Sequence, residues 1–254
     1  MKLKRKTAIV TGGASGIGRA TAIALGLEGA NVAIADIAVE QAEKVCSQIK
    51  DSGFGSAVAC RTDLTKRADV EQMVKTVLGQ FGQIDILVNC AGWDRLEPFL
   101  ESTEETWDKV LSINFKSVLQ TAKAVLPNMI QHGSGKIINI ASDAGRVGSS
   151  WEAVYSGAKG AVIAFSKTLA RESARYNINV NVICPGMTDT PLMQAIKDQS
   201  EKTAKIVDAV IKATPFRRAA KPEEIAAMVV FLASSDSDFV TGQTISVSGG
   251  LTMS

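Results

Sequence analysis

The sequence predicts a single α/β domain, in which helices cover both faces of a doubly wound, seven-stranded parallel sheet. Seven short runs of β-branched and apolar residues recur without alternating polar positions, as expected of strands that are covered on both faces. Longer segments with a helical period separate these runs, and regular strand–helix alternation is typical of parallel sheets. The length of 254 residues suits one large domain, and no linker or internal repeat divides it.

The first half of the chain predicts four strands and three helices. The opening strand runs into a glycine-rich turn, and the helix after that turn ends near another glycine, a residue that favours helix C-termini. The expected order is strand 7–13, helix 18–30, strand 31–36, helix 39–53, strand 56–63, helix 67–82 and strand 84–92.

The second half continues the alternation, with one interruption. The expected order is helix 104–132, strand 136–142, a helix that carries Tyr155, strand 179–186, helix 222–234 and strand 243–250. The segment 188–221 lies between the strand 179–186 and the helix 222–234 and is too long for a simple connection. Long insertions of this kind are often lids, so we expect this segment to cover a substrate.

Composition excludes several classes of function. The net charge of +2 and the lack of a basic stripe disfavour a nucleic-acid binder. The charged N-terminus leads directly into a strand pattern, and no apolar run reaches the ~18–20 residues of a membrane span, so we expect a cytoplasmic protein without a signal peptide. The four cysteines form no C-x-x-C pair and His132 is the single histidine, so we expect no metal site and no Ser-His-Asp hydrolase.

The turn after the first strand is a candidate dinucleotide site. Gly12, Gly16 and Gly18 stand between strand and helix, where glycine lets the backbone approach a pyrophosphate at the helix N-terminus. The spacing differs from the common G-x-G-x-x-G pattern, and such a turn alone is equally consistent with a simple bend. Asp36 ends the second strand, where a carboxylate accepts hydrogen bonds from a ribose 2′-hydroxyl and repels a 2′-phosphate. This pattern favours NAD over NADP.

Tyr155 and Lys159 are four residues apart on one expected helix, so their side chains meet. A nearby ammonium group stabilises tyrosinate, so we expect Lys159 to lower the pKa of Tyr155. Tyrosine then serves as an acid/base for an alcohol–ketone couple. Such pairs also occur by chance. Ser142 ends the fifth expected strand and is a candidate to orient the substrate oxygen.

Together these residues resemble the short-chain dehydrogenase/reductase family over essentially the whole chain. The motifs are "TGGASGIG", Asp36, Asp63–Leu64, "NCAG" at 89–92, "SINF", Ser142, Tyr155, Lys159 and "PGMTDT" at 185–190. Cys90 departs from the family's usual "NNAG", and we expect it to pack inward. The resemblance implies a Rossmann-type sheet, a nicotinamide cofactor and a homotetramer.

The resemblance also implies roles for individual residues. Tyr155 is the general base in oxidation, Ser142 holds the reacting oxygen, Lys159 grips the nicotinamide ribose, and Asn114 anchors a water of the proton relay. The expected cofactor-binding residues are Gly12, Ser15, Gly16, Ile17, Gly18, Asp36, Ile37, Asp63, Leu64, Asn89, Ala91, Gly92, Tyr155, Lys159, Pro185, Gly186, Thr188 and Thr190.

Several loops resemble the 2-hydroxycyclohexanecarboxyl-CoA dehydrogenases within this family, which act in the anaerobic degradation of alicyclic and aromatic acids. The matching segments are "AGWD", "SDAGRVGSS", "SKTLARE", "CPGMTDT" and "SVSGGLTM". The candidate substrate residues are Trp93, Asp94, Arg146, Trp151, Met187 and Met193, and the candidate partners for CoA phosphates are Arg95, Arg146, Arg217 and Arg218. An arginine in such a loop is more often a solvated or structural residue, and Trp151 and Met193 are equally consistent with the core or a subunit interface.

The resemblance therefore predicts NAD-dependent oxidation of a cyclic β-hydroxyacyl-CoA. A dehydrogenase of a free secondary alcohol or sugar, or a 3-oxoacyl thioester reductase, remains an alternative. A non-catalytic NAD-binding subunit is a third possibility, which the complete set of Ser142, Tyr155 and Lys159 argues against.

Overall fold

The computed structural model, which describes residues 1–253, contains one parallel sheet in the order β3-β2-β1-β4-β5-β6-β7. The strands are β1 (Thr7–Thr11), β2 (Asn31–Asp36), β3 (Ala57–Arg61), β4 (Ile86–Asn89), β5 (Gly135–Ile140), β6 (Ile178–Pro185) and β7 (Thr244–Val247). The chain winds from β1 outward to β3, then returns to β4 beside β1 and continues to β7. This confirms the predicted Rossmann-type sheet. The reversal between β1 and β4 opens a crevice at the carboxyl ends of the strands, where ligands bind in such sheets.

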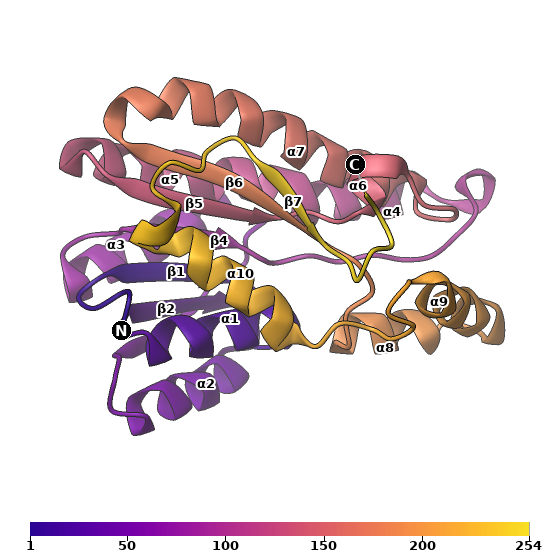
Figure 1. Ribbon diagram of the computed structural model, residues 1–254, viewed down its shortest axis with the longest axis horizontal. Helices are drawn as coiled ribbons and strands as arrows, with labels where there is room; N and C mark the ends of the chain where they lie inside the picture. Colours follow the sequence, from indigo (N-terminus) through magenta and orange to yellow (C-terminus); the bar gives the residue numbers. More distant parts are fainter. Residues whose placement is uncertain (254) are drawn as a thin grey trace.

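Helices cover both faces of the sheet (Figure 1). One layer consists of α1 (Gly16–Leu27), α2 (Val39–Asp51) and α10 (Pro222–Ala233). The other contains α3 (Arg67–Phe81), α5 (Ser117–His132) and α7 (Ala153–Ser173). Side chains of successive strand residues point to opposite faces of the sheet, since Ala8 and Val10 pack in the first core and Ile9 in the second. Burial on both faces explains why the strands read as continuous apolar runs.

The long helix expected over 104–132 is interrupted. It consists of α4 (Glu104–Leu111), a π-helical turn at Ser112–Lys116 and then α5. Asn114 lies within this turn, and its amide donates to the carbonyl of Val110 at 2.9 Å and to that of Trp93 at 2.7 Å. These bonds tie the turn to the loop after β4. Single π-helical turns inside longer helices often lie at functional sites.

The segment 188–221 contains α8 (Pro191–Lys197) and α9 (Glu201–Ala213). Its two ends pair with each other, because Asp189 N donates to the Ala220 carbonyl at 2.9 Å and Ala220 N donates to the Met187 carbonyl at 2.8 Å. Ile196 and Val207 from the two helices form a separate small core with Leu96. Figure 1 shows α8 and α9 set apart from the two helical layers, beyond the end of the sheet. A pair of helices on a narrow base fits the predicted lid, whose closure stays a prediction.

Across residues 1–253, none of the helices combines the length and the apolar character that crossing a bilayer requires.

Candidate active site

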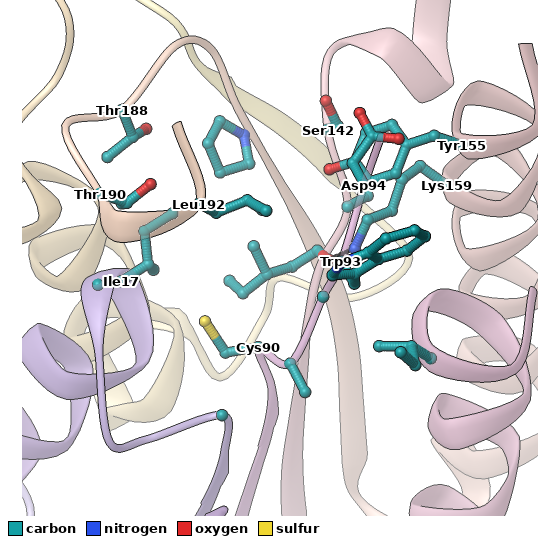
Figure 2. Close-up of a pocket in the computed structure, with 18 of the residues that line it drawn as sticks. Ile17, Cys90, Trp93, Asp94, Ser142, Tyr155, Lys159, Thr188, Thr190 and Leu192 are labelled. Carbon is teal, nitrogen blue, oxygen red and sulfur yellow. Dashed lines mark hydrogen bonds between the residues drawn. The ribbon is translucent and has the colours of Figure 1, made fainter. Parts of the chain in front are cut away.

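A cavity of about 760 Å³ opens at the carboxyl ends of the strands. Residues from the turns after β1 to β6 line it, together with α8 and the start of α7. Figure 2 shows Ser142, Tyr155 and Lys159 on one side, with Thr188, Thr190 and Leu192 opposite. The site that the sequence predicted from scattered segments is therefore assembled at the topological switch point of the sheet.

The turn between β1 and α1 leaves no room for a side chain at its glycines. A Cβ on Gly12 would lie 2.8 Å from the Ala91 backbone, and a Cβ on Gly18 would collide with the Gly12 carbonyl. Gly16 has a φ of +51°, which L side chains rarely adopt. Because the turn exposes backbone at the N-terminus of α1, it fits the pyrophosphate of a dinucleotide.

Asp36 lies at the end of β2 beside the same turn. Its carboxylate accepts hydrogen bonds from the backbone N–H groups of Ala14 and Ala38, both at 3.0 Å. These two donors fix the side chain where β2 meets the glycine turn, and Asp36 lines the cavity. Each carboxylate oxygen has a further lone pair, so the group still has acceptor capacity for a ribose hydroxyl.

Asp63 and Leu64 also line the cavity, as predicted for the adenine end. The carboxylate of Asp63 accepts bonds from the Thr65 hydroxyl at 2.6 Å and the Thr65 N–H at 3.0 Å, and Lys66 Nζ lies 3.3 Å away. These hydrogen bonds, above all the one from the Thr65 hydroxyl, lower the pKa of Asp63. Asp63 therefore shapes the loop that carries Leu64.

Asn89 is the one predicted cofactor residue that does not line the cavity. Its side chain is buried in the sheet interior, where Nδ2 donates to Asn139 Oδ1 at 2.8 Å and Oδ1 accepts from the Thr121 hydroxyl at 2.7 Å. Asn139 in turn donates to Ser166 Oγ at 2.8 Å. This network links β4, β5, α5 and α7 beneath the site, so the Asn89 side chain supports the site from below.

Asn114 is fully buried and likewise stands outside the cavity lining. Besides the two bonds from its Nδ2, its Oδ1 accepts from Trp93 N at 3.3 Å. The side chain therefore holds the backbone of Trp93 from both sides. A Cβ on Gly92 would lie 3.1 Å from Asn114 Oδ1 and 3.7 Å from Lys159 Nζ, which places all three groups together. Its role in a water relay stays a prediction.

Ser142, Tyr155 and Lys159 meet because two short segments pack closely. The short helix α6 (Ala144–Val147) lies against α7, and a Cβ on Gly145 would be 2.7 Å from the Lys159 backbone. This contact brings Ser142, at the end of β5, next to Tyr155 (Figure 2). Lys159 Nζ donates to the Ile140 carbonyl at 2.9 Å and lies 5.6 Å from the centre of the Tyr155 ring.

The electrostatics of this group differ from the prediction. Burial is the largest effect on Tyr155 and raises its pKa, and the nearby carboxyl groups of Asp94 and Glu152 raise it further. The hydrogen bond with Ser142 acts in the opposite direction. Burial also lowers the pKa of Lys159 to about 8. The expectation that Lys159 lowers the pKa of Tyr155 was wrong for this structure, because loss of solvation dominates for both groups.

Four of the six predicted substrate residues line the cavity, namely Trp93, Asp94, Met187 and Met193. Arg146 and Trp151 do not, which corrects those two predictions. Arg146 instead donates to the carbonyl of Thr244 at 3.0 Å and to Ser246 Oγ at 3.2 Å, so it anchors β7. Trp151 packs in the small core of α8 and α9, with Lys202 Nζ 4.1 Å above its ring.

The arginines suggested for CoA phosphates lie outside the cavity lining. Arg218 forms a bidentate pair with Glu224 at 2.6 and 2.7 Å, and Arg95 pairs with Glu97 at 3.2 Å. Arg217 is exposed and has a positive φ of 53°. None of them lines the cavity, and their contact with CoA phosphates stays a prediction.

Several lining residues were missed by the sequence analysis. Glu152 and Leu192 both line the cavity, and so does Cys90, which was expected to pack inward. Cys90 contacts the core yet keeps part of its side chain on the cavity wall (Figure 2). Glu152 had a usable signal, because it lies three residues before Tyr155 on the same side of a helix start. Leu192 had none beyond its position in the insertion.

Comparison with known proteins agrees with this geometry. A family model described as enoyl-(acyl carrier protein) reductase matches residues 12–252. The chain is 36% identical over 251 residues to a 3-oxoacyl-[acyl-carrier-protein] reductase of Thermotoga maritima, covering 99% of both chains. It is 39% identical over 264 residues to a sorbitol dehydrogenase of Cereibacter sphaeroides, covering 100% of both.

Solved structures give the same result. A levodione reductase superposes with a TM-score of 0.93 at 32% identity, covering 98% of both chains. An NAD⁺-bound xylitol dehydrogenase also gives a TM-score of 0.93, at 33% identity, covering 98% of this chain and 100% of the other. The chain therefore belongs to the short-chain dehydrogenase/reductase family and is an oxidoreductase that acts on a CH–OH group.

Proposed function

We propose that this enzyme uses NAD to interconvert a secondary alcohol and a ketone. The observation that carries the proposal is the meeting of Ser142, Tyr155 and Lys159 at one wall of a cavity whose other end is the glycine turn and Asp36. A carboxylate beside the expected ribose position repels a 2′-phosphate, which supports NAD over NADP. The similarity to an NAD⁺-bound xylitol dehydrogenase points the same way.

The chain's own groups supply binding and proton transfer. The bound nicotinamide provides the hydride acceptor for oxidation. The hydroxyl of Ser142 donates a hydrogen bond to the reacting oxygen, and the Tyr155 oxygen takes the alcohol proton as general base. In ketone reduction, Tyr155 returns that proton, and its raised pKa keeps it protonated for this direction. Lys159, held by the Ile140 carbonyl, lies beside the tyrosine ring to stabilise the developing phenolate.

For the substrate we propose a cyclic β-hydroxyacyl-CoA of the 2-hydroxycyclohexanecarboxyl-CoA kind. The loops that resemble enzymes for such thioesters contribute Trp93, Asp94 and Met187 to the cavity. Leu192 and Met193 add an apolar wall from α8, which suits an alicyclic ring.

A polyol is the second candidate, because relatives at 39% and 33% identity act on sorbitol and xylitol by name. The carboxyl groups of Asp94 and Glu152 in the cavity suit hydroxyl-rich ligands. A 3-oxoacyl thioester is a third, given the similarity to a 3-oxoacyl-[acyl-carrier-protein] reductase. The resemblance also predicts a homotetramer, which light scattering on the purified protein tests.

The test is NADH formation with a panel of substrates at equal concentration. The panel contains 2-hydroxycyclohexanecarboxyl-CoA, its free acid, sorbitol, xylitol and a linear 3-hydroxyacyl-CoA, each with NAD and with NADP. We expect the cyclic thioester to give the highest kcat/KM, with NAD. Preference for sorbitol or xylitol would replace the thioester proposal with a polyol dehydrogenase. Preference for the linear thioester would assign acyl-chain reduction instead.

A further inference from the structure

Two carboxyl groups share the substrate side of the cavity. Asp94 follows β4, and Glu152 lies at the N-terminal cap of α7, three residues before Tyr155. Both line the cavity, and Figure 2 places Asp94 on the same side as Ser142 and Tyr155. Asp94 is only 5% exposed, and its Oδ2 atom has no hydrogen-bond donor. A buried, unpartnered carboxyl oxygen at a ligand cavity calls for an explanation.

A shared proton resolves this arrangement. Two adjacent carboxyl groups in a buried site cannot both ionise without strong repulsion. Burial first, and then the charge and hydrogen bonding of Glu152, raise the pKa of Asp94 to about 9. At neutral pH, Asp94 therefore carries a proton, so its buried, unpartnered oxygen holds no charge. The pair has one net negative charge.

Nearby cations do not neutralise this charge by direct contact. Lys109 and Lys159 are the ammonium groups that line the cavity. Lys159 donates to the Ile140 carbonyl, and Lys109 lies 3.9 Å above the Trp93 ring. On the loop of Asp94, the Arg95 side chain is paired with Glu97 and is 57% exposed. The negative charge therefore acts mainly on groups inside the cavity, among them Tyr155.

We propose that Asp94 and Glu152 act as one specificity element, whose negative charge repels a carboxylate beside the reacting carbinol and admits an uncharged group at that position. This inference rests on the proposed alcohol dehydrogenase function and deepens it. A thioester and an ester present a neutral group at that position, whereas the free hydroxy acid presents an anion. The pair would therefore favour turnover of activated acyl substrates over turnover of the free acids that form when they are hydrolysed.

The test compares a neutral and an anionic substrate of the same shape. We would measure kcat/KM for methyl 2-hydroxycyclohexanecarboxylate and for the free acid at pH 7. Two like charges within a few ångströms in a protein site predict a preference for the ester on the order of 10- to 100-fold. The double variant Asp94→Asn/Glu152→Gln keeps the shape and removes the charge. It should bring the ratio close to one by improving turnover of the acid.

Asp94→Asn alone is the matched control. Because Asp94 is protonated in the pair, this change leaves the charge of Glu152 in place, so the preference for the ester should persist. A double variant that keeps the wild-type ratio would overturn the proposal, and so would a wild-type enzyme that turns over both compounds equally. A purely structural role would lower both activities without changing their ratio.

Two further measurements test this inference independently of which alcohol is the natural substrate. Removing the charge removes one cause of the raised pKa of Tyr155, so the acidic limb of the pH profile for oxidation, where the general base is protonated, should move to lower pH with any alcohol the enzyme accepts. If the variant does not fold, competitive inhibition of the wild type by cyclohexanecarboxamide and cyclohexanecarboxylate replaces it. The amide should bind on the order of 10- to 100-fold more tightly. Equal inhibition would overturn the proposal even if the thioester is the substrate.

Discussion

Replacing Lys159 by methionine should make the protein more stable while impairing turnover. The ammonium group is 3% exposed, and burial lowers its pKa from 10.5 to about 8. A shift of this size corresponds to about 3 kcal/mol of destabilisation by the buried charge at neutral pH. Methionine removes this cost but leaves the Ile140 carbonyl without its donor, at about 1 kcal/mol. The net gain at pH 7 is therefore about 2 kcal/mol.

The stability advantage of Lys159→Met should decrease as the pH rises. Because the folded-state pKa of Lys159 lies below the unfolded value, folding below pH 8 requires burial of a charged group. The penalty is largest below pH 8 and decreases as the pH rises from 8 toward 10.5, where the unfolded chain also loses the proton. The advantage of Lys159→Met should therefore shrink to about zero near pH 10.

Urea denaturation of the cofactor-free protein at pH 7 and at pH 10 measures both values. Lys44→Met is the matched control, since Lys44 is exposed on α2, and its effect should stay within about 0.5 kcal/mol. A variant that is less stable than wild type at pH 7 would refute the reasoning. So would an advantage that is the same at both pH values.

The remaining predictions concern the cofactor cradle and its support. Gly18→Ala places a Cβ on the Gly12 carbonyl and should weaken NADH binding by about 1–3 kcal/mol in calorimetry, whereas Gly79→Ala, with no atom near the added Cβ, should not. Asp36→Asn removes the charge that repels a 2′-phosphate, and the preference for NAD over NADP in kcat/KM should fall about tenfold or more. Asn139→Ala leaves two buried partners, including Asn89, unpaired and should cost about 2–4 kcal/mol in urea denaturation. An unchanged cofactor ratio or an unchanged stability would contradict the corresponding prediction.

The sheet was predictable because its strands are buried on both faces and so leave an uninterrupted apolar pattern. The run at 31–36 matches β2 in full. The run at 84–92 was too long, since β4 ends at Asn89 and the following residues turn into the cavity. The expected helix over 104–132 missed the π-helical turn, because that turn depends on contacts of Asn114 with a loop distant in sequence.

For the site residues, the sequence motifs predicted where the backbone lies better than they predicted which way each side chain points. Asn89 ends β4 and Arg146 lies in α6, both next to the site as expected, but their side chains turn toward Asn139 and β7. Which way a side chain points depends on which strand lies next to it, and the sequence does not show that order directly. The pKa of Tyr155 was mispredicted for a related reason, because burial depends on the whole packed cavity, whereas the proximity of Lys159 follows from local spacing.

The most direct test of the account is Tyr155→Phe, assayed with the best alcohol from the substrate panel. The change removes the one oxygen assigned to proton transfer and keeps the ring. Turnover should fall by roughly 10²–10⁴-fold, the usual contribution of a general acid–base. NADH binding, measured by fluorescence titration on the same protein, should stay within a few-fold of wild type. Turnover within tenfold of wild type, with binding intact, would contradict the assignment of Tyr155 as the acid–base group.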